Sequence, residues 1–209
     1  MIDDPTGPDV LRDRVLDAVL AHVAFDGWSQ AAIRSAVSAG AIVAAESVLA
    51  FPAGPVGMIE WHSLRADRRV AAEMERRGAD GLKVRDRITL GIRLRLEGVT
   101  AEREAVRRAI FVLAFPFNAP LAAKLLYRTV DSIWYAAGDT ATDFNFYTKR
   151  GLLAGVYSAT LMYWLNDRSD DGSATWAFLA RRIDDVMRIE KLKSRVQGFG
   201  ATWRTGPAR

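Results

Sequence analysis

The segment from Trp134 to Arg150 holds the side chains best suited to binding a partner. It places five aromatic residues and a basic pair within seventeen residues, between two stretches with helical spacing. If a helix runs on from Asp143, its spacing sets Phe146 beside Lys149 and Arg150. An exposed aromatic residue flanked by arginine is typical of the residues that dominate protein interfaces. The alternative is that the aromatic side chains here are buried and the cations merely solvated, as on most amphipathic helices.

Residue types that carry out catalysis or bind metals are scarce. The 209 residues include no cysteine and two histidines, His22 and His62, and neither has a second histidine at ligand spacing along its helix. The sequence shows no Ser–His–Asp order and no glycine-rich phosphate loop. We therefore predict no catalytic residue, no metal site and no cofactor.

Apolar residues of the C-terminal half are numerous enough to form the walls of a ligand cavity. Such cavities are mostly apolar with a few polar anchors. An ordinary core would contain the same residues, so both interpretations stay open. The candidate wall residues are Leu113, Phe115, Phe117, Leu121, Leu125, Leu126, Ile133, Trp134, Leu161, Trp164 and Leu165.

Helical rather than alternating spacing of apolar residues runs through nearly the whole chain. Gly27 is expected to end the first helix and Ser29 to cap the second. Pro116 and Pro120 mark the clearest interior break. Half of the residues are apolar, enough for one sizeable core, and the length does not demand two domains. The sequence predicts a single all-α domain of about nine helices, at residues 9–26, 29–39, 41–50, 55–77, 82–97, 101–115, 120–137, 143–166 and 173–197.

The first three predicted helices resemble the N-terminal helix-turn-helix of TetR-type regulators, through Val15 to Trp28, Ile33 and Ala39-Gly40-Ala41. DNA binding depends on cations that displace phosphate counterions and on long polar side chains that read bases. Residues 35–64 contain no lysine or arginine. We therefore expect a degenerate helix-turn-helix over residues 9–51 and no nucleic-acid partner. The alternative function is a TetR-family transcriptional regulator with a small apolar ligand.

Two longer runs of residues follow a specific order. The first is Asp131-Ser-Ile-Trp134-Tyr135-Ala-Ala-Gly138-Asp139-Thr-x-Thr-Asp143-x-Asn145-x-Tyr147-Thr-Lys149-Arg150. The second is Trp176-x-Phe178-Leu179-x-x-Arg182-Ile183-x-Asp185-Val186-Met187. Together they closely resemble the lipid-binding accessory proteins of ubiquinone (coenzyme Q) biosynthesis, the ninth of the coenzyme Q proteins. The resemblance extends more loosely back to Arg12, and it departs at Phe146, where the family often has tryptophan.

This resemblance implies a TetR-like fold and a non-catalytic role. The core of residues 55–187 would bind an isoprenoid quinone precursor or a phospholipid. It would present that lipid to the di-iron hydroxylase that acts on demethoxyubiquinone, which would supply the chemistry. TetR-like domains pair through their C-terminal helices, so a homodimer is expected. On the matching positions, the implied partner-binding residues are Asp143, Asn145, Phe146, Tyr147 and Arg150.

Residues 188–209 have the character of a basic amphipathic tail. An apolar stripe flanked by cations suits an anionic membrane surface. The alternative is that the stripe packs on the body of the protein; segment 41–59, where Glu46 is the one charge, would then be the next candidate for membrane contact. The candidate membrane-binding residues are Arg188, Ile189, Lys191, Leu192, Lys193, Arg195 and Val196.

The first nine residues are acidic and rich in turn formers, unlike a signal or transit peptide. The most apolar stretch, residues 35–59, is broken by Pro52 and Pro55 before it reaches the length of a single membrane-spanning helix. We therefore expect a cytoplasmic protein that is peripheral on the inner face of the cytoplasmic membrane.

Overall fold

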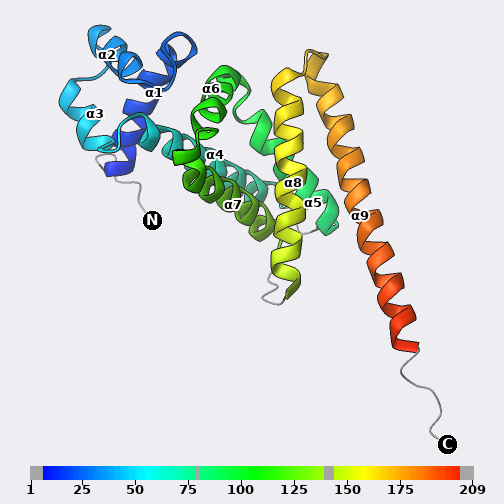
Figure 1. Cartoon of the computed structure of the whole chain (residues 1–209). Coiled ribbons are helices and arrows are strands. Elements are labelled where there is room, and N and C mark those ends of the chain that lie inside the picture. The colour runs from blue at the N-terminus through cyan, green and yellow to red at the C-terminus, as the bar shows by residue number, and fades with distance from the viewer. Residues whose placement is uncertain (1–6, 79–80, 139–143, 203–209) are drawn as a thin grey trace, which may run out of the picture.

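The computed structural model describes residues 7–78, 81–138 and 144–202, and their side chains except at 144–147, 187 and 189–202. Within these ranges the secondary structure is helical, which confirms the predicted all-α class (Figure 1). The α-helices are α1 (Pro8–Asp26), α2 (Gln30–Ser38), α3 (Ala44–Ala50), α4 (Pro55–Arg77), α5 (Val84–Glu97), α6 (Arg103–Leu113), α7 (Ala119–Ala136), α8 (Phe144–Asn166) and α9 (Ser173–Thr202). Short 3-10 helices lie between them: η2 (Thr100–Glu102), η3 (Pro116–Asn118) and η4 (Asp170–Gly172).

The helices form a small N-terminal group joined to a larger C-terminal bundle. Helix α1 packs against α2, α3 and α6, whereas α4 packs along α7, and α8 packs between α7 and α9. Figure 1 shows α1 to α3 at one end of the molecule and α9 running beside α8 at the other. Because α4 contacts both α1 and α7, it connects the two parts.

Two hydrophobic cores follow this division. The N-terminal core gathers around the buried face of α1, where Val15, Leu16, Val19 and Val23 are almost fully enclosed. The C-terminal core is built by α5, α7, α8 and α9 around large side chains such as Ile92 and Trp164. Burial of these side chains is the main source of stability, at about 1.5–3 kcal/mol for each large apolar side chain.

Local chemistry sets the helix ends, and several predicted boundaries are confirmed. Gly27 follows α1 with a φ of 67°, a conformation that glycine adopts without strain. The Ser29 hydroxyl accepts hydrogen bonds from the backbone N–H groups of Ala31 and Ala32, which caps α2. Helix α6 ends before Pro116, since a residue that precedes proline avoids the helical conformation.

Three helices begin two or three residues later than predicted. Helix α6 begins at Arg103 rather than at residue 101, because residues Thr100–Glu102 form the 3-10 helix η2. Helix α3 begins at Ala44 rather than at residue 41, because the Glu46 carboxylate accepts a hydrogen bond from the Val43 N–H and fixes the start there. Helix α5 begins at Val84, so Leu82 lies outside it and is exposed.

Among the described residues, no helix is both long and apolar enough to cross a membrane by itself. The segments Thr100–Leu113 and Pro116–Ala136 meet this criterion when taken together, but they are bent by 102°.

Candidate functional site

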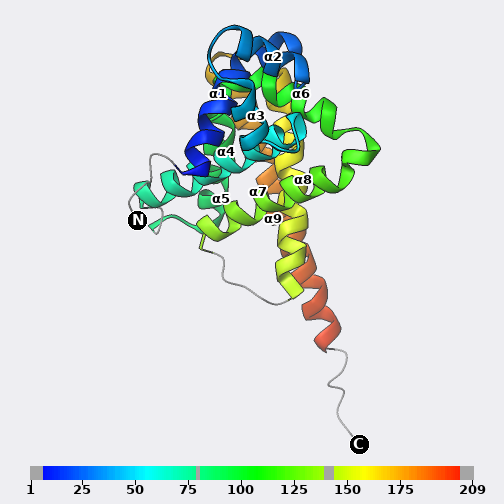
Figure 2. The ribbon, with the colours of Figure 1, turned by 90° about the vertical axis from the view of Figure 1, so that its left-hand side faces the viewer.

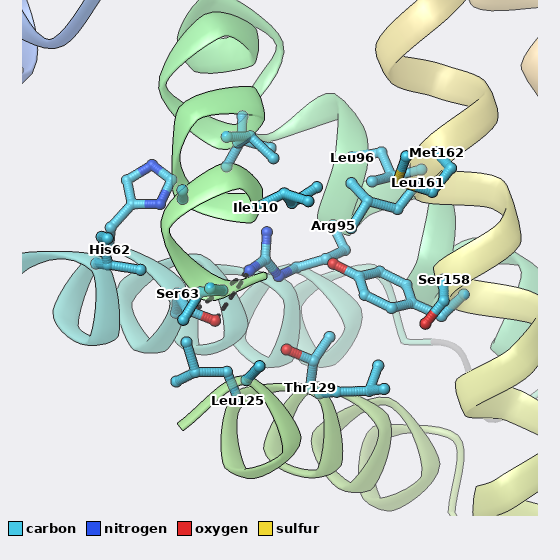
Figure 3. A pocket seen from close by; sticks show the side chains of 18 of the residues that line it. His62, Ser63, Arg95, Leu96, Ile110, Leu125, Thr129, Ser158, Leu161 and Met162 are labelled. Atoms are coloured by element: carbon cyan, nitrogen blue, oxygen red, sulfur yellow. Dashed lines mark hydrogen bonds between the residues drawn. The ribbon is translucent and has the colours of Figure 1, made fainter. Parts of the chain in front are cut away.

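A pocket of about 360 Å³ lies among α4, α5, α6, α7 and α8 in the C-terminal bundle. Its walls are mostly apolar, and they combine residues from distant parts of the chain (Figure 3). The apolar lining consists of Ile59, Leu96, Val99, Val106, Ala109, Ile110, Leu113, Ala114, Ala122, Leu125, Leu126, Leu161 and Met162. The polar lining consists of His62, Ser63, Arg95, Thr129, Tyr157 and Ser158.

Arg95 is the charged group that a ligand in this pocket would meet. The side chain is 7% exposed, and Nε donates a hydrogen bond of 2.8 Å to the carboxylate of Asp67. Nη2 lies 3.4 Å from the Ser63 hydroxyl, and Figure 3 shows the guanidinium reaching toward Ser63. The Thr129 hydroxyl donates to the same Asp67 carboxylate at 2.9 Å. This pairing compensates the cost of burying a permanent cation next to the cavity.

A second polar group on the lining is His62. Its Nε2 lies 2.5 Å from a carboxylate oxygen of Glu102, and Arg65 lies 3.7 Å from the other oxygen. Burial lowers the pKa of His62, although the hydrogen bond with Glu102 acts in the opposite direction. The same hydrogen bond lowers the pKa of Glu102. At neutral pH a neutral imidazole therefore donates its Nε2–H to an ionised carboxylate.

Tyr157 contributes a hydroxyl to the lining, and burial raises its pKa, so that it remains a protonated donor. The arrangement suits recognition of hydrogen-bond acceptors more than covalent chemistry. Within the described part of the chain, no group of three or more His, Cys, Asp or Glu residues is placed to hold a metal ion.

The structure brings four of the candidate wall residues together at this pocket: Leu113, Leu125, Leu126 and Leu161. The others lie elsewhere. Leu121 packs against the N-terminal core, and Ile133, Trp164 and Leu165 lie in the C-terminal core. Trp134 borders a smaller cavity of about 70 Å³, with Lys149 Nζ 5.6 Å from the centre of its ring. Phe115 and Phe117 are exposed at the turn between α6 and α7.

Helices α4 and α5 also contribute to the lining, through residues that were not among the predicted wall residues. The position of Arg95 in the sequence did indicate a role for α5. Arg95 follows Ile88 and Ile92 by seven and three residues, so it falls on the inner stripe of α5. A charged residue on a buried stripe is an unusual feature that marks a polar anchor.

Comparison with known proteins shows similarity to one family. Residues 119–190 match the family model described as COQ9. The chain is 31% identical over 202 residues to the ubiquinone biosynthesis protein COQ9, mitochondrial, of Drosophila melanogaster, which covers 94% of this chain and 61% of that protein. The human protein of the same name is 31% identical over 209 residues, covering 95% and 64%. The chain is therefore similar to COQ9 proteins over nearly its whole length.

The chain spans less than two thirds of the length of these relatives, at 61% and 64%. The rat COQ9 protein gives a similar result, at 29% identity with coverage of 95% of this chain and 65% of that protein.

A crystal structure of a TetR transcriptional regulator from Nitrosomonas europaea matches with a TM-score of 0.71, covering 84% of this chain and 97% of that chain at 23% identity. This likeness shows the TetR-like fold alone. In this protein, α3 carries Glu46 as its one charged residue and exposes Val48 and Leu49. Its surface thus offers no cation to a phosphate backbone. The absence of a nucleic-acid partner stays a prediction.

The implied partner-binding residues lie at or before the start of α8. Asp143 lies outside the described residues. For Asn145, Phe146 and Tyr147 the structure describes the backbone but not the side chains. Arg150 is buried, and its Nε donates a 2.7 Å hydrogen bond to Asp131 of α7. Arg150 therefore joins α7 to α8.

Residues 188–202 of the proposed tail belong to the last part of α9, which continues to Thr202, and residues 203–209 lie outside the described residues. Arg188 is exposed. The structure does not describe the side chains of the other candidate membrane-binding residues, which are Ile189, Lys191, Leu192, Lys193, Arg195 and Val196.

Proposed function

We propose that this protein is a non-catalytic accessory protein of ubiquinone biosynthesis, which binds an isoprenoid quinone precursor or a phospholipid and presents it to the demethoxyubiquinone hydroxylase. The observation that best supports lipid binding is the pocket between α4 and α8, with its apolar walls and buried Arg95. The names of the COQ9 relatives support the pathway.

The pocket is suited to one end of a long amphiphile. Its volume of about 360 Å³ lies near the lower limit of ligand pockets, which measure about 300–1,000 Å³. A long polyprenyl chain exceeds this volume, so part of the lipid would lie outside the pocket. The Arg95 guanidinium keeps its charge at all physiological pH values and donates hydrogen bonds in a fixed geometry. It would suit the oxygens of a quinone-type head group or of a phosphate.

The hydroxylase is proposed to dock near the start of α8, and its di-iron centre would carry out the chemistry. Phe146→Ala is expected to weaken capture of the hydroxylase without lowering thermal stability. Arg150→Ala is a less selective test, because it also removes the ion pair with Asp131 that joins α8 to α7.

A cavity-filling substitution tests lipid binding. Ala122 lines the pocket, whereas the adjacent Ala123 is exposed and does not line it. Ala122→Phe should therefore fill part of the cavity and abolish lipid uptake, while Ala123→Phe should bind like the unaltered protein. Native mass spectrometry after incubation with demethoxyubiquinone or phosphatidylglycerol measures the bound fraction. Equal uptake by the two variants, or no uptake by the unaltered protein, would contradict the proposal.

The protein is proposed to act at the cytoplasmic membrane surface, with residues 188–209 as one point of contact. The cations of this tail would attract anionic lipids, and its apolar stripe would enter the interface. Deletion of residues 188–209 should then reduce flotation with anionic vesicles. Unchanged flotation would assign the contact to another part of the chain.

A further inference from the structure

Residues 109–123 form a bent apolar elbow between α6 and α7. Helix α6 ends at Leu113 and α7 begins at Ala119, and the two helical segments are bent by 102°. Figure 2 shows this green elbow standing out from the body of the molecule. Three phenylalanine side chains of the elbow are exposed, by 69% at Phe111, 44% at Phe115 and 77% at Phe117.

The three rings pack on one another. The centroids of Phe111 and Phe115 lie 5.5 Å apart with the rings nearly perpendicular, and those of Phe115 and Phe117 lie 5.6 Å apart with the rings stacked. They form one continuous aromatic surface. An exposed apolar patch of this kind marks a site of interaction with a partner or a membrane.

The charge distribution around the elbow favours an anionic lipid surface. Residues 109–123 carry no charge, and cations stand at both ends of the run, with Arg107 and Arg108 before it and Lys124 after it. Glu104 pairs with the two arginines. Glu60 pairs with Lys124 and also with Arg128, so that these four cations outnumber the two carboxylates.

Most backbone N–H groups of the turn are hydrogen-bonded within it. This suits an apolar environment, in which an unsatisfied N–H group is costly. Pro116 and Pro120 have no N–H group. The Asn118 side chain donates a 2.8 Å hydrogen bond to the Val112 carbonyl and satisfies a group that the end of α6 leaves free. Further N–H groups of the turn donate to carbonyls within it, at Ala114, Phe115, Asn118 and Ala119.

The elbow adjoins the pocket. Leu113, Ala114 and Ala122 belong both to the elbow and to the pocket lining. A lipid bound at the elbow would therefore lie next to residues of the pocket lining.

We propose that the elbow is a membrane-insertion element, which places Phe111, Phe115 and Phe117 at the boundary between head groups and acyl chains of an anionic bilayer. Insertion of aromatic side chains combined with attraction of nearby cations is how interfacial segments bind. This contact is separate from the tail of residues 188–209. It is measured without any ligand in the pocket, so its failure is distinguishable from a failure of lipid uptake.

The test compares full-length variants by flotation with vesicles of phosphatidylcholine alone and of an equal mixture with phosphatidylglycerol. The triple variant Phe111→Ser, Phe115→Ser, Phe117→Ser should lose at least about tenfold in partitioning, because three exposed apolar side chains no longer enter the bilayer. Tyr135→Ser is the matched control, since Tyr135 is 79% exposed at the far end of α7. This control should float like the unaltered protein.

Insertion itself is detected with Phe117→Trp in the full-length chain. Relative to the unaltered protein, its added fluorescence should shift to shorter wavelength and be quenched by lipids with brominated acyl chains. Flotation of the triple variant at the level of the unaltered protein, or no added quenching, would overturn the proposal. If the triple variant floats like the unaltered protein but light scattering shows that it has changed from dimer to monomer, the elbow would instead be a contact between two copies of this chain.

Discussion

At the scale of single residues, the pocket depends on a buried charge that is fully paired. Asp67 accepts hydrogen bonds from both Arg95 and Thr129, and the side chains of Asp67 and Arg95 are each 7% exposed. Removing the negative charge leaves Arg95 uncompensated in a medium that solvates it poorly.

Asp67→Asn should therefore lower the free energy of unfolding by about 3 kcal/mol or more. Asp184→Asn provides the control, because the Arg85–Asp184 pair is about half exposed and such a pair contributes about 0–1 kcal/mol. Urea denaturation of both variants measures the difference. Similar losses in the two variants would show that burial of the Asp67–Arg95 pair has no special effect.

His62 makes stability depend on pH. Burial lowers its pKa in the folded state below the ordinary value of 6.5. As pH falls through about 6.5, the unfolded chain binds a proton at this residue before the folded chain does, so the stability that is present above this pH is lost. The denaturation midpoint of the unaltered protein should decrease between about pH 7 and about pH 5.

His62→Gln keeps a donor for Glu102 but does not titrate in this range, so its midpoint should depend less on pH. The same pH dependence in both proteins would show that His62 is not the responsible group.

At the scale of helices, local signals predicted most elements. Proline, glycine and serine act through neighbouring backbone groups, so the ends of α1 and α2 and the break at Pro116 could be read from the sequence. The pocket could not, because its lining comes from five helices whose packing depends on residues far apart in the chain. Phe115 and Phe117 show the same limit. Their apolar character suited a cavity wall, but the turn at Pro116 directs them outward.

The start of α9 depends on one carboxylate. Asp167 accepts hydrogen bonds of 2.8 Å from the backbone N–H groups of Ser169 and Thr175. Hydrogen bonds from the Ser169 and Thr175 side chains lower its pKa, so this support persists into acid. Asp167→Ala should lower stability by about 1–2 kcal/mol, as loss of a helix cap does. Asp170→Ala, at an exposed neighbour, should have less effect in the same thermal denaturation experiment, and an equal effect would exclude the capping role.

At the scale of the whole molecule, two resemblances made the TetR-like fold predictable. Residues 15–41 resemble the helix-turn-helix of TetR-type regulators, and two later runs resemble a family with a TetR-like fold. The homodimer stays a prediction. Light scattering should give twice the chain mass of 23.1 kDa, and a concentration-independent mass near 23.1 kDa would contradict it.

We propose above all that the pocket between α4 and α8 binds the isoprenoid lipid. The most direct measurement is photocrosslinking of the full-length protein with a demethoxyubiquinone analogue that carries a diazirine on its first isoprene unit, followed by peptide mass spectrometry. We expect labelling at Leu113, Leu125 or Leu161, which line the pocket. Excess demethoxyubiquinone should prevent this labelling, and the Ala122→Phe substitution should abolish it. Labelling confined to other surfaces, or unaffected by competitor, would contradict it.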